Sequence, residues 1–397
     1  MDGFPSCAKP CLNETGAASS CAQSDIQCLC GNPQLTTVLE GCFLQACTVK
    51  EAFTAKRLTD DTCGVAPRAQ TDIFVVVSTL FLVIALICVL LRAAGRLVGS
   101  GFGLDDGAIG LALVIAIAVG VFAFPLRNLG LGEDIWNIPF KDITKTLHLF
   151  NISTDIYPPC IALIKISMLF LYLRLFPGRK LRIITIFTIV LTGCWGIIYT
   201  LLGIFACSPR SYAWTNWDGE HEGKCLNQAA IIVSHAIINI IFDVLVIALP
   251  LPTLLRLKLS KTKKAGVCLM FLVGFVVTVL SILRLSTSMG FVKSHNPTRD
   301  FVPVSIWSVL EIDIGIICAC LPEIRALCKF VLPSSKSYLT HPSPQPSPEN
   351  PPWRDTTWRD SRRDTVSGNT QKSFRLSLSS SGRVRPSARE FVTLRDV

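Results

Sequence analysis

Seven long apolar segments restrict what this chain can fold into. A helix of about 20 apolar residues crosses a hydrocarbon core of about 30 Å. Seven segments approach that length: 72–94, 105–126, 145–175, 181–206, 229–255, 265–289 and 304–328. The third is the weakest, because its first half is polar and Pro158–Pro159 should kink it. A body without it would have six spans, but we expect an all-α body with a seven-helix transmembrane bundle.

The composition agrees with a membrane protein. Half of the 397 residues are apolar and 17% are charged, whereas soluble proteins have about 25% charged residues. The net charge of +10 is concentrated in short loops between spans and in the C-terminal region. Basic residues beside spans set orientation and contact anionic lipids. We therefore expect the lipid bilayer as a partner, and no nucleic acid.

Loop charge predicts the orientation of the bundle. Three short alternate loops between the predicted spans carry eleven basic residues and no carboxylate: Arg92, Arg96, Arg174, Arg179, Lys180, Arg182, Arg256, Lys258, Lys261, Lys263 and Lys264. The positive-inside rule assigns these loops to the cytoplasm. We therefore predict a multi-pass plasma-membrane protein with an extracellular N-terminus and a cytoplasmic C-terminus.

Cysteines crowd the N-terminal region. Eight of the seventeen lie in the first 63 residues: Cys7, Cys11, Cys21, Cys28, Cys30, Cys42, Cys47 and Cys63. An even set in so short a stretch indicates a disulfide framework, which persists in an oxidising compartment. Spacing alone leaves 105 pairings open. The stretches 34–44 and 50–58 look helical, so we predict a small disulfide-stapled helical extracellular domain.

The chain divides into four parts: an extracellular domain at 1–66, a linker at 67–71, the bundle at 72–330 and a disordered cytoplasmic tail at 331–397. The tail is rich in Pro, Ser and Arg, which cannot bury a core, and Thr365 follows two arginines as in a kinase site. The first seventy residues hold no continuous apolar run. We expect either that the first span acts as the export signal or that a leader precedes this sequence.

Two further features concern the extracellular side. Asn13 opens an Asn-Glu-Thr sequon, which is acceptable for glycosylation on an exposed loop. Cys207 and Cys225 bracket the second predicted outer loop, and we expect a disulfide across it.

The cysteine spacing, with Asp25 four residues after the third cysteine and the Cys28-Leu29-Cys30 pair, resembles the fungal CFEM domain over about residues 5–65. The resemblance implies the disulfides Cys7–Cys47, Cys11–Cys42, Cys21–Cys28 and Cys30–Cys63. It also implies haem binding with Asp25 as the axial iron ligand, a hard anionic ligand suited to ferric iron. Alternatively, Asp25 caps a helix.

Ionisable residues inside spans are costly and are candidates for function. They are Lys165 in the third span, His235, Asn239 and Asp243 in the fifth, Arg284 in the sixth, and Glu311 and Asp313 in the seventh. The three in the fifth span follow at i, i+4 and i+8, so they share one helix face. We expect interhelical pairs such as Lys165 with Asp243 or Glu311. These pairs either fix packing or form a bistable core.

Several functional classes of protein are disfavoured because the sequence lacks their motifs. The segment 304–328 contains no lysine, which argues against a retinal Schiff base. No internal repeat of the kind found in transporters is visible. No phosphate loop, nucleophile elbow or zinc-hydrolase motif occurs, so we expect no enzyme.

The body resembles fungal G-protein-coupled-receptor-like integral membrane proteins linked to surface sensing and pathogenicity. The matching elements are Asp105-Asp106, Lys165-Ile166-Ser167, Cys207-Ser208-Pro209, Leu249-Pro250-Leu251-Pro252, Arg284 and Glu311 with Gly315 to Pro322. The resemblance implies a receptor for an external or host cue, with a G protein or another cytosolic signalling partner. Two alternatives remain: a haem-acquisition protein using Asp25, and an adhesion or structural protein.

Overall fold

The computed structural model describes residues 3–17, 30–66, 71–99, 101–176, 178–252, 261–292, 294 and 296–331. These residues belong to one compact unit, Met1–Ser335. The predicted tail beyond Val331, with Thr365, lies outside the described residues, as do Asp25, Cys21 and Cys28.

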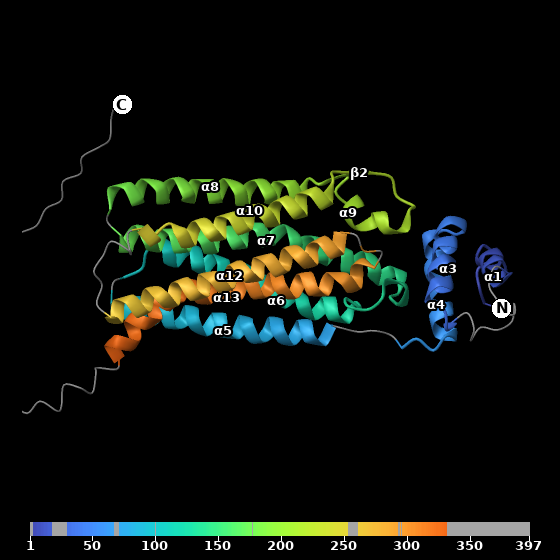
Figure 1. Cartoon of the computed structure of the whole chain (residues 1–397), viewed down its shortest axis with the longest axis horizontal. Helices are drawn as coiled ribbons and strands as arrows, with labels where there is room; N and C mark the ends of the chain where they lie inside the picture. Colours follow the sequence, from blue (N-terminus) through green and yellow to red (C-terminus); the bar gives the residue numbers. More distant parts are fainter. Residues whose placement is uncertain are drawn as a thin grey trace, which may run out of the picture. The chain divides into compact units, whose positions relative to one another are not determined.

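Seven helices of the described part are long and apolar enough to cross a membrane. They are α5 (Thr71–Val98), α6 (Leu104–Asn128), α7 (Phe140–Leu175), α8 (Arg179–Ile204), α10 (Gln228–Ala248), α12 (Lys261–Val292) and α13 (Pro297–Val331). Figure 1 shows them running side by side as one bundle. The prediction of a seven-helix body is confirmed.

Two of the predicted span limits differ from the ends of the observed helices. The fifth span was expected to reach residue 255, but α10 ends at Ala248 because Pro250 and Pro252 have no backbone N–H to donate. The first span was expected to end at residue 94, but α5 continues to Val98. In contrast, α7 stays helical through Pro158 and Pro159.

Helices α7 and α13 form the centre of the bundle. In each of them 61% of the apolar span window is buried by protein, compared with 22% to 39% in the other five helices. The buried apolar cluster around them contains small and branched side chains, among them Ala162 and Ile164 of α7 and Ile312 and Ile316 of α13. Most of the apolar window of these two helices is therefore shielded from lipid, and polar groups buried there must be solvated by protein.

Short elements join the helices at one end of the bundle, which we call the head end. They are η1 (Ile135–Asn137), α9 (Tyr212–Thr215), η2 (Asn216–Asp218) and the strands β1 (Cys207–Ser208) and β2 (Lys224–Cys225). The strands pair antiparallel with Cys207 opposite Cys225, and a disulfide joins these two residues. We call the opposite end of the bundle the far end.

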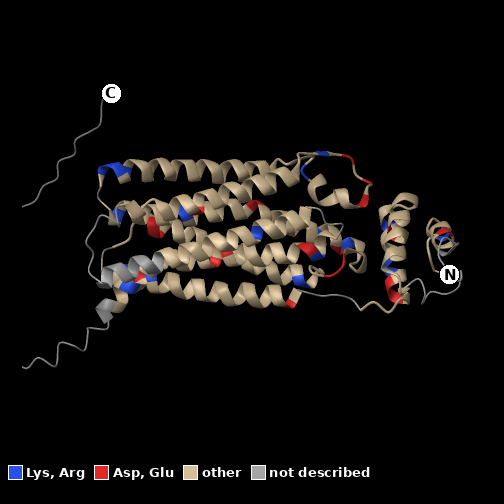
Figure 2. Cartoon of the chain, viewed as in Figure 1, with Lys and Arg blue, Asp and Glu red and all other residues tan. Residues whose placement is uncertain are grey.

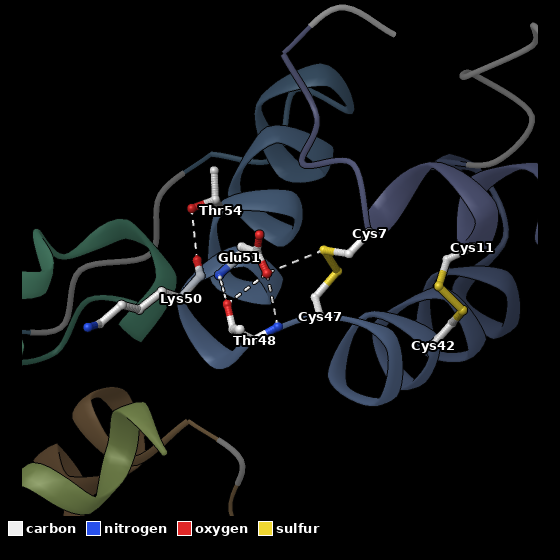
Figure 3. The surroundings of a disulfide bond; sticks show 8 residues. All are labelled: Cys7, Cys11, Cys42, Cys47, Thr48, Lys50, Glu51 and Thr54. Carbon is white, nitrogen blue, oxygen red and sulfur yellow. Dashed lines mark hydrogen bonds between the residues drawn. A yellow bond between two sulfur atoms is a disulfide. The ribbon is translucent and has the colours of Figure 1, made fainter. Parts of the chain in front are cut away.

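The N-terminal domain is helical and stapled by disulfides. Its helices are α1 (Ala8–Ala17), α3 (Pro33–Ala46) and α4 (Val49–Thr62). The disulfides Cys7–Cys47, Cys11–Cys42 and Cys30–Cys63 connect them, and Figure 3 shows the first two. Leu39, Phe43 and Ala55 fill the small core. The predicted class, a stapled helical head before a helical bundle, is therefore the class observed.

A capping box fixes the start of α4, next to the Cys7–Cys47 disulfide (Figure 3). The Thr48 hydroxyl donates to Glu51 Oε2 at 2.8 Å, and the Thr48 amide donates to the same oxygen at 3.1 Å. The Glu51 amide donates back to Thr48 Oγ1 at 3.4 Å. Such reciprocal bonds satisfy amides that the first helical turn leaves unpaired.

From the capping box we predict that the start of α4 becomes less stable in acid. The hydrogen bonds from Thr48 lower the pKa of the Glu51 carboxyl from its usual value of 4.5. The folded head therefore binds fewer protons here than the unfolded head, and this stabilisation disappears as the pH falls through the lowered pKa. We expect hydrogen exchange of the first α4 amides, relative to a Glu51→Gln variant at the same pH, to accelerate below pH 4.5. An identical pH profile in the two proteins would contradict the role of Glu51.

Candidate functional site

The predicted ion pair in the bundle centre joins α7 to α10. Lys165 Nζ donates a short hydrogen bond to Asp243 Oδ1. The two side chains are 5% and 7% exposed, so each charge has little water to solvate it. Of the two partners that the sequence offered to Lys165, the structure selects Asp243.

Glu311 on α13 is the hub of the buried polar residues. Its carboxylate accepts hydrogen bonds from Tyr157 Oη at 2.6 Å, Asn239 Nδ2 at 2.5 Å and Ser281 Oγ at 2.6 Å. These donors come from α7, α10 and α12. A carboxylate that is 1% exposed needs such partners, because burying an unpaired charge costs several kcal/mol. Glu311 thereby ties four helices together.

Arg284 on α12 has looser contacts. Its guanidinium lies 3.8 Å from the centre of the Tyr157 ring, and its Nε donates to Ser308 Oγ at 3.0 Å. Its Nη1 is 3.9 Å from Glu311 Oε2, too far for a hydrogen bond. We define the core polar cluster as Tyr157, Lys165, Asn239, Asp243, Ser281, Arg284 and Glu311. It holds two cations and two carboxylates.

Two sequence candidates lie outside this cluster. His235 shares the buried face with Asn239 and Asp243, but aromatic rings surround it, with Trp195 stacked at 4.8 Å and Tyr199 at 5.0 Å. Asp313 is buried, and its Oδ2 has no hydrogen-bond partner among the described residues. His235, Asn239 and Asp243 therefore share one face of α10, as predicted, but have two different environments. Neighbouring helices place aromatic rings around His235 and charged residues around Asn239 and Asp243.

A cavity opens on each side of the core polar cluster. The head-end cavity, of about 120 Å³, is lined by residues that include Tyr157, His235 and Arg284. The far-end cavity, of about 100 Å³, is lined by residues that include Lys165, Asp243 and Glu311. The cluster thus separates two cavities, and a change in either one can reach its charges.

A second group of charges was missed as a site. Arg92 donates to Asp105 at 2.5 Å, to Asp106 at 2.7 Å and to the Ala319 carbonyl at 2.6 Å. Arg96 pairs with the same two aspartates and, at 3.1 Å, with Glu323. We call Arg92, Arg96, Asp105, Asp106 and Glu323 the far-end ion cluster; it joins α5, α6 and α13.

The far-end ion cluster corrects the sequence interpretation. Arg92 and Arg96 were counted as loop charges, but they lie inside α5 and are only 2% and 1% exposed. Two features of the sequence could have predicted this cluster. Arg92 and Arg96 are spaced i, i+4, which puts both on one helix face, and only a short loop separates them from Asp105-Asp106. The positive charge that remains at this end includes Arg179, Lys180 and Arg182 at the start of α8 (Figure 2).

The head contacts the head-end loops through α4. Lys50 Nζ lies 2.7 Å from Glu220 Oε2 and 3.9 Å from Asp218 Oδ2. The Phe53 ring stacks on Trp217 with centroids 6.3 Å apart, and Lys56 Nζ lies 5.3 Å from the centre of the Trp136 ring. Ile135, Ile138 and Ile143 complete this apolar group. The head and the bundle are therefore in direct contact.

The remaining predicted positions have mixed outcomes. The structure forms the Cys207–Cys225 bridge. Asn13 is exposed, but it lies within α1 rather than on a loop, because the helix extends to Ala17. Asp25 and the Cys21–Cys28 pair are outside the described residues, so their roles stay predictions.

Comparison with known proteins identifies both parts of the chain. Residues 91–330 match the fungal rhodopsin domain, and residues 1–64 match the CFEM domain. A SAT4 family membrane protein of Emericella nidulans is 30% identical over 204 residues, 50% of each chain. The satratoxin biosynthesis SC1 cluster protein 4 of Stachybotrys chartarum is 27% identical over 165 residues, 41% of this chain and 59% of that protein.

Receptor GIN3 of Arthrobotrys oligospora is 24% identical over 249 residues, 63% of this chain and 57% of that protein. The chain thus spans between half and three fifths of the length of these three relatives. No solved structure matches. The family and the relatives point to a receptor-like membrane protein and not to an enzyme, as the motifs predicted.

The buried Lys165–Asp243 pair gives a test of the core polar cluster. Lys165→Met or Asp243→Leu should each destabilise the bundle by about 3–5 kcal/mol, because each leaves an unpaired buried charge. The double variant should lose less than either single variant, since it removes both charges. Thermal unfolding of the purified full chain in detergent measures the difference. Met168→Leu, also on α7, is the matched control and should cost under about 1.5 kcal/mol; additive single effects would contradict the pairing.

Proposed function

This chain belongs to the fungal rhodopsin domain family, and from that premise we propose that it is a cell-surface receptor that senses an external or host cue through its CFEM head. The observation that supports this proposal best is the contact of α4 with the head-end loops. A head that touches the bundle can transmit a change in its own position or occupancy. A tethered adhesion domain would need no such contact.

The loops that α4 contacts are themselves bonded to the start of α13. Asn296 accepts a hydrogen bond from the Ile135 amide at 3.1 Å and donates to Asp134 Oδ1 at 2.7 Å. Thr298 donates to the Glu133 carbonyl at 2.9 Å. Since η1 packs on the head and α13 carries Glu311, these bonds connect the head to the core polar cluster.

The same helix continues to the far end. Glu323 on α13 joins the far-end ion cluster through Arg96, and Arg92 bonds the α13 backbone at Ala319. A shift of α13 would therefore change the contacts of Glu311 and Glu323 together. We propose that this helix is the bistable element through which the cue acts, since ligands shift equilibria only between states that differ in contacts.

The proposed orientation follows from charge. Arg179, Lys180 and Arg182 lie at the far end, and basic residues favour the cytoplasmic side. We accordingly propose a plasma-membrane location with the head outside, and a G protein or another cytosolic protein as the partner at the far end. The Cys207–Cys225 disulfide at the head end fits an oxidising exterior.

A charge swap tests transmission from the head. Lys50→Glu should abolish the response to a cue, because it places like charges beside Glu220 and Asp218. The double variant Lys50→Glu/Glu220→Lys should recover a part of the response, since it restores one pair. The readout is proximity labelling of cytosolic proteins by a ligase fused to the C-terminus, in cells on a hard apolar surface and in liquid culture.

The matched control is Lys9→Glu, which changes the same charge on α1, away from the ion pairs of α4. Surface abundance of every variant is measured in parallel. An identical set of labelled proteins on the surface and in liquid would refute the receptor proposal. A response that survives Lys50→Glu would refute transmission through the α4 contact.

We propose haem capture by the head as a second function, supported by the CFEM match over residues 1–64 and by the three head disulfides. Asp25 would be the axial ligand to ferric iron. Titration of the oxidised full chain with haem should give a saturable absorbance band that Asp25→Ala removes. Asp61→Ala, an exposed aspartate on α4, is the control and should keep the band; no saturable band in the unmodified chain would exclude this function.

A further inference from the structure

Most of the head-end cavity is lined by aromatic and branched side chains, which we call the apolar wall, among them Phe150, Phe291, Phe301 and Val304. Arg284, His235, Ser288 and Ser305 line the same cavity and contribute polar groups. Binding sites for small molecules have this composition: mostly apolar, with a few convergent polar groups that fix orientation.

Four polar atoms at this cavity lack hydrogen bonds. They are His235 Nε2, Arg284 Nη1, Ser288 Oγ and Ser305 Oγ, none of which has a hydrogen-bond partner among the described residues. All four residues are at least nine-tenths buried. Native interiors leave few buried polar groups unpaired. Their gathering at one cavity therefore marks a place where a polar ligand group would be accepted.

The charge at the cavity selects the sign of that group. Arg284 is a lining cation, and Glu311, its nearest carboxylate, already accepts bonds from Tyr157, Asn239 and Ser281. Asp155 also lines the cavity, but Arg210 pairs with it at 3.1 Å. An ammonium group would face the cation of Arg284, whereas a carboxylate would match its fork of N–H donors.

Helix geometry adds a second donor. Ser288 follows Arg284 at i+4 on α12, so the two side chains share a helix face. A carboxylate has two oxygens, each able to accept bonds. Arg284 Nη1 and Ser288 Oγ can supply both from one helix, with Ser305 of α13 also at the cavity.

We propose that the head-end cavity binds an amphipathic monocarboxylic acid, with its chain against the apolar wall and its carboxylate on Arg284. The inference rests on the proposed receptor function and names the ligand class of that receptor. A carboxylate bound to Arg284 Nη1 adds a second anion beside a guanidinium that already lies 3.9 Å from Glu311 Oε2. Because Glu311 ties four helices together, occupancy of the cavity changes the balance of contacts at the core polar cluster.

The test uses the purified full chain in detergent, titrated calorimetrically with octanoic acid, 1-octanol and octylamine, which differ only in their polar group. Octanoate should bind saturably, and the alcohol and the amine should bind at least about tenfold more weakly. Arg284→Gln should weaken octanoate about tenfold. Ser305→Ala, which removes one unpaired hydroxyl and leaves the ion pairs intact, should weaken it about threefold.

Cys318→Ala in the far-end cavity is the matched control and should leave octanoate affinity unchanged. Equal binding of the amine or the alcohol would overturn the proposal. The proposal would also be overturned if neither Ser305→Ala nor Arg284→Gln changed the affinity for octanoate, or if Cys318→Ala weakened octanoate binding as much as these two substitutions do. Proximity labelling separates this proposal from the receptor proposal. If the set of labelled proteins differs between cells on the hard surface and cells in liquid culture, but octanoate does not bind, the carboxylate site alone is refuted. If octanoate binds but the labelled proteins do not differ, the site is supported and the receptor function is refuted.

Discussion

The structure depends on the burial of Glu311 at the centre of a lipid-facing bundle. Neither lipid nor water can solvate a carboxylate there, so protein donors must do it. Three helices supply those donors through Tyr157, Asn239 and Ser281. This requirement fixes how α7, α10 and α12 are rotated against α13, because a rotated helix would leave a buried charge without a partner.

The far-end ion cluster imposes the same requirement, that buried charges be paired by protein, at the far end of the bundle. Arg92 and Arg96 bring the end of α5 to the start of α6 and to Glu323 on α13. Helix α13 therefore carries an acidic residue at each of two buried clusters, and its first turns are bonded to the loops that the head contacts. The two cavities lie between these fixed points, and the head-end cavity is lined by residues whose polar atoms lack hydrogen-bond partners among the described residues.

Much of the fold followed from the sequence, and less of the site did. Apolar length predicted seven spans, and the Pro250 and Pro252 signals were available to shorten the fifth. Periodicity placed His235, Asn239 and Asp243 on one face, but it could not foresee that Trp195 and Tyr199 would surround His235. Arg92 and Arg96 were misassigned because the sequence does not distinguish an arginine in a loop from one buried at the end of a helix. The distinction requires knowing which helices pack against it.

The sequence by itself determined the class of the protein: a cysteine-rich helical head, seven apolar helices and ionisable residues on α7, α10, α12 and α13. These properties are local, because helix length, apolar periodicity and cysteine spacing are read within one segment. Only the tertiary structure decided that Lys165 pairs with Asp243 and that Glu311 collects three donors. It also left Arg284 Nη1, at the head-end cavity, with no hydrogen-bond partner in the described part of the chain. Those outcomes depend on the relative rotation of helices far apart in sequence, and no single segment encodes it.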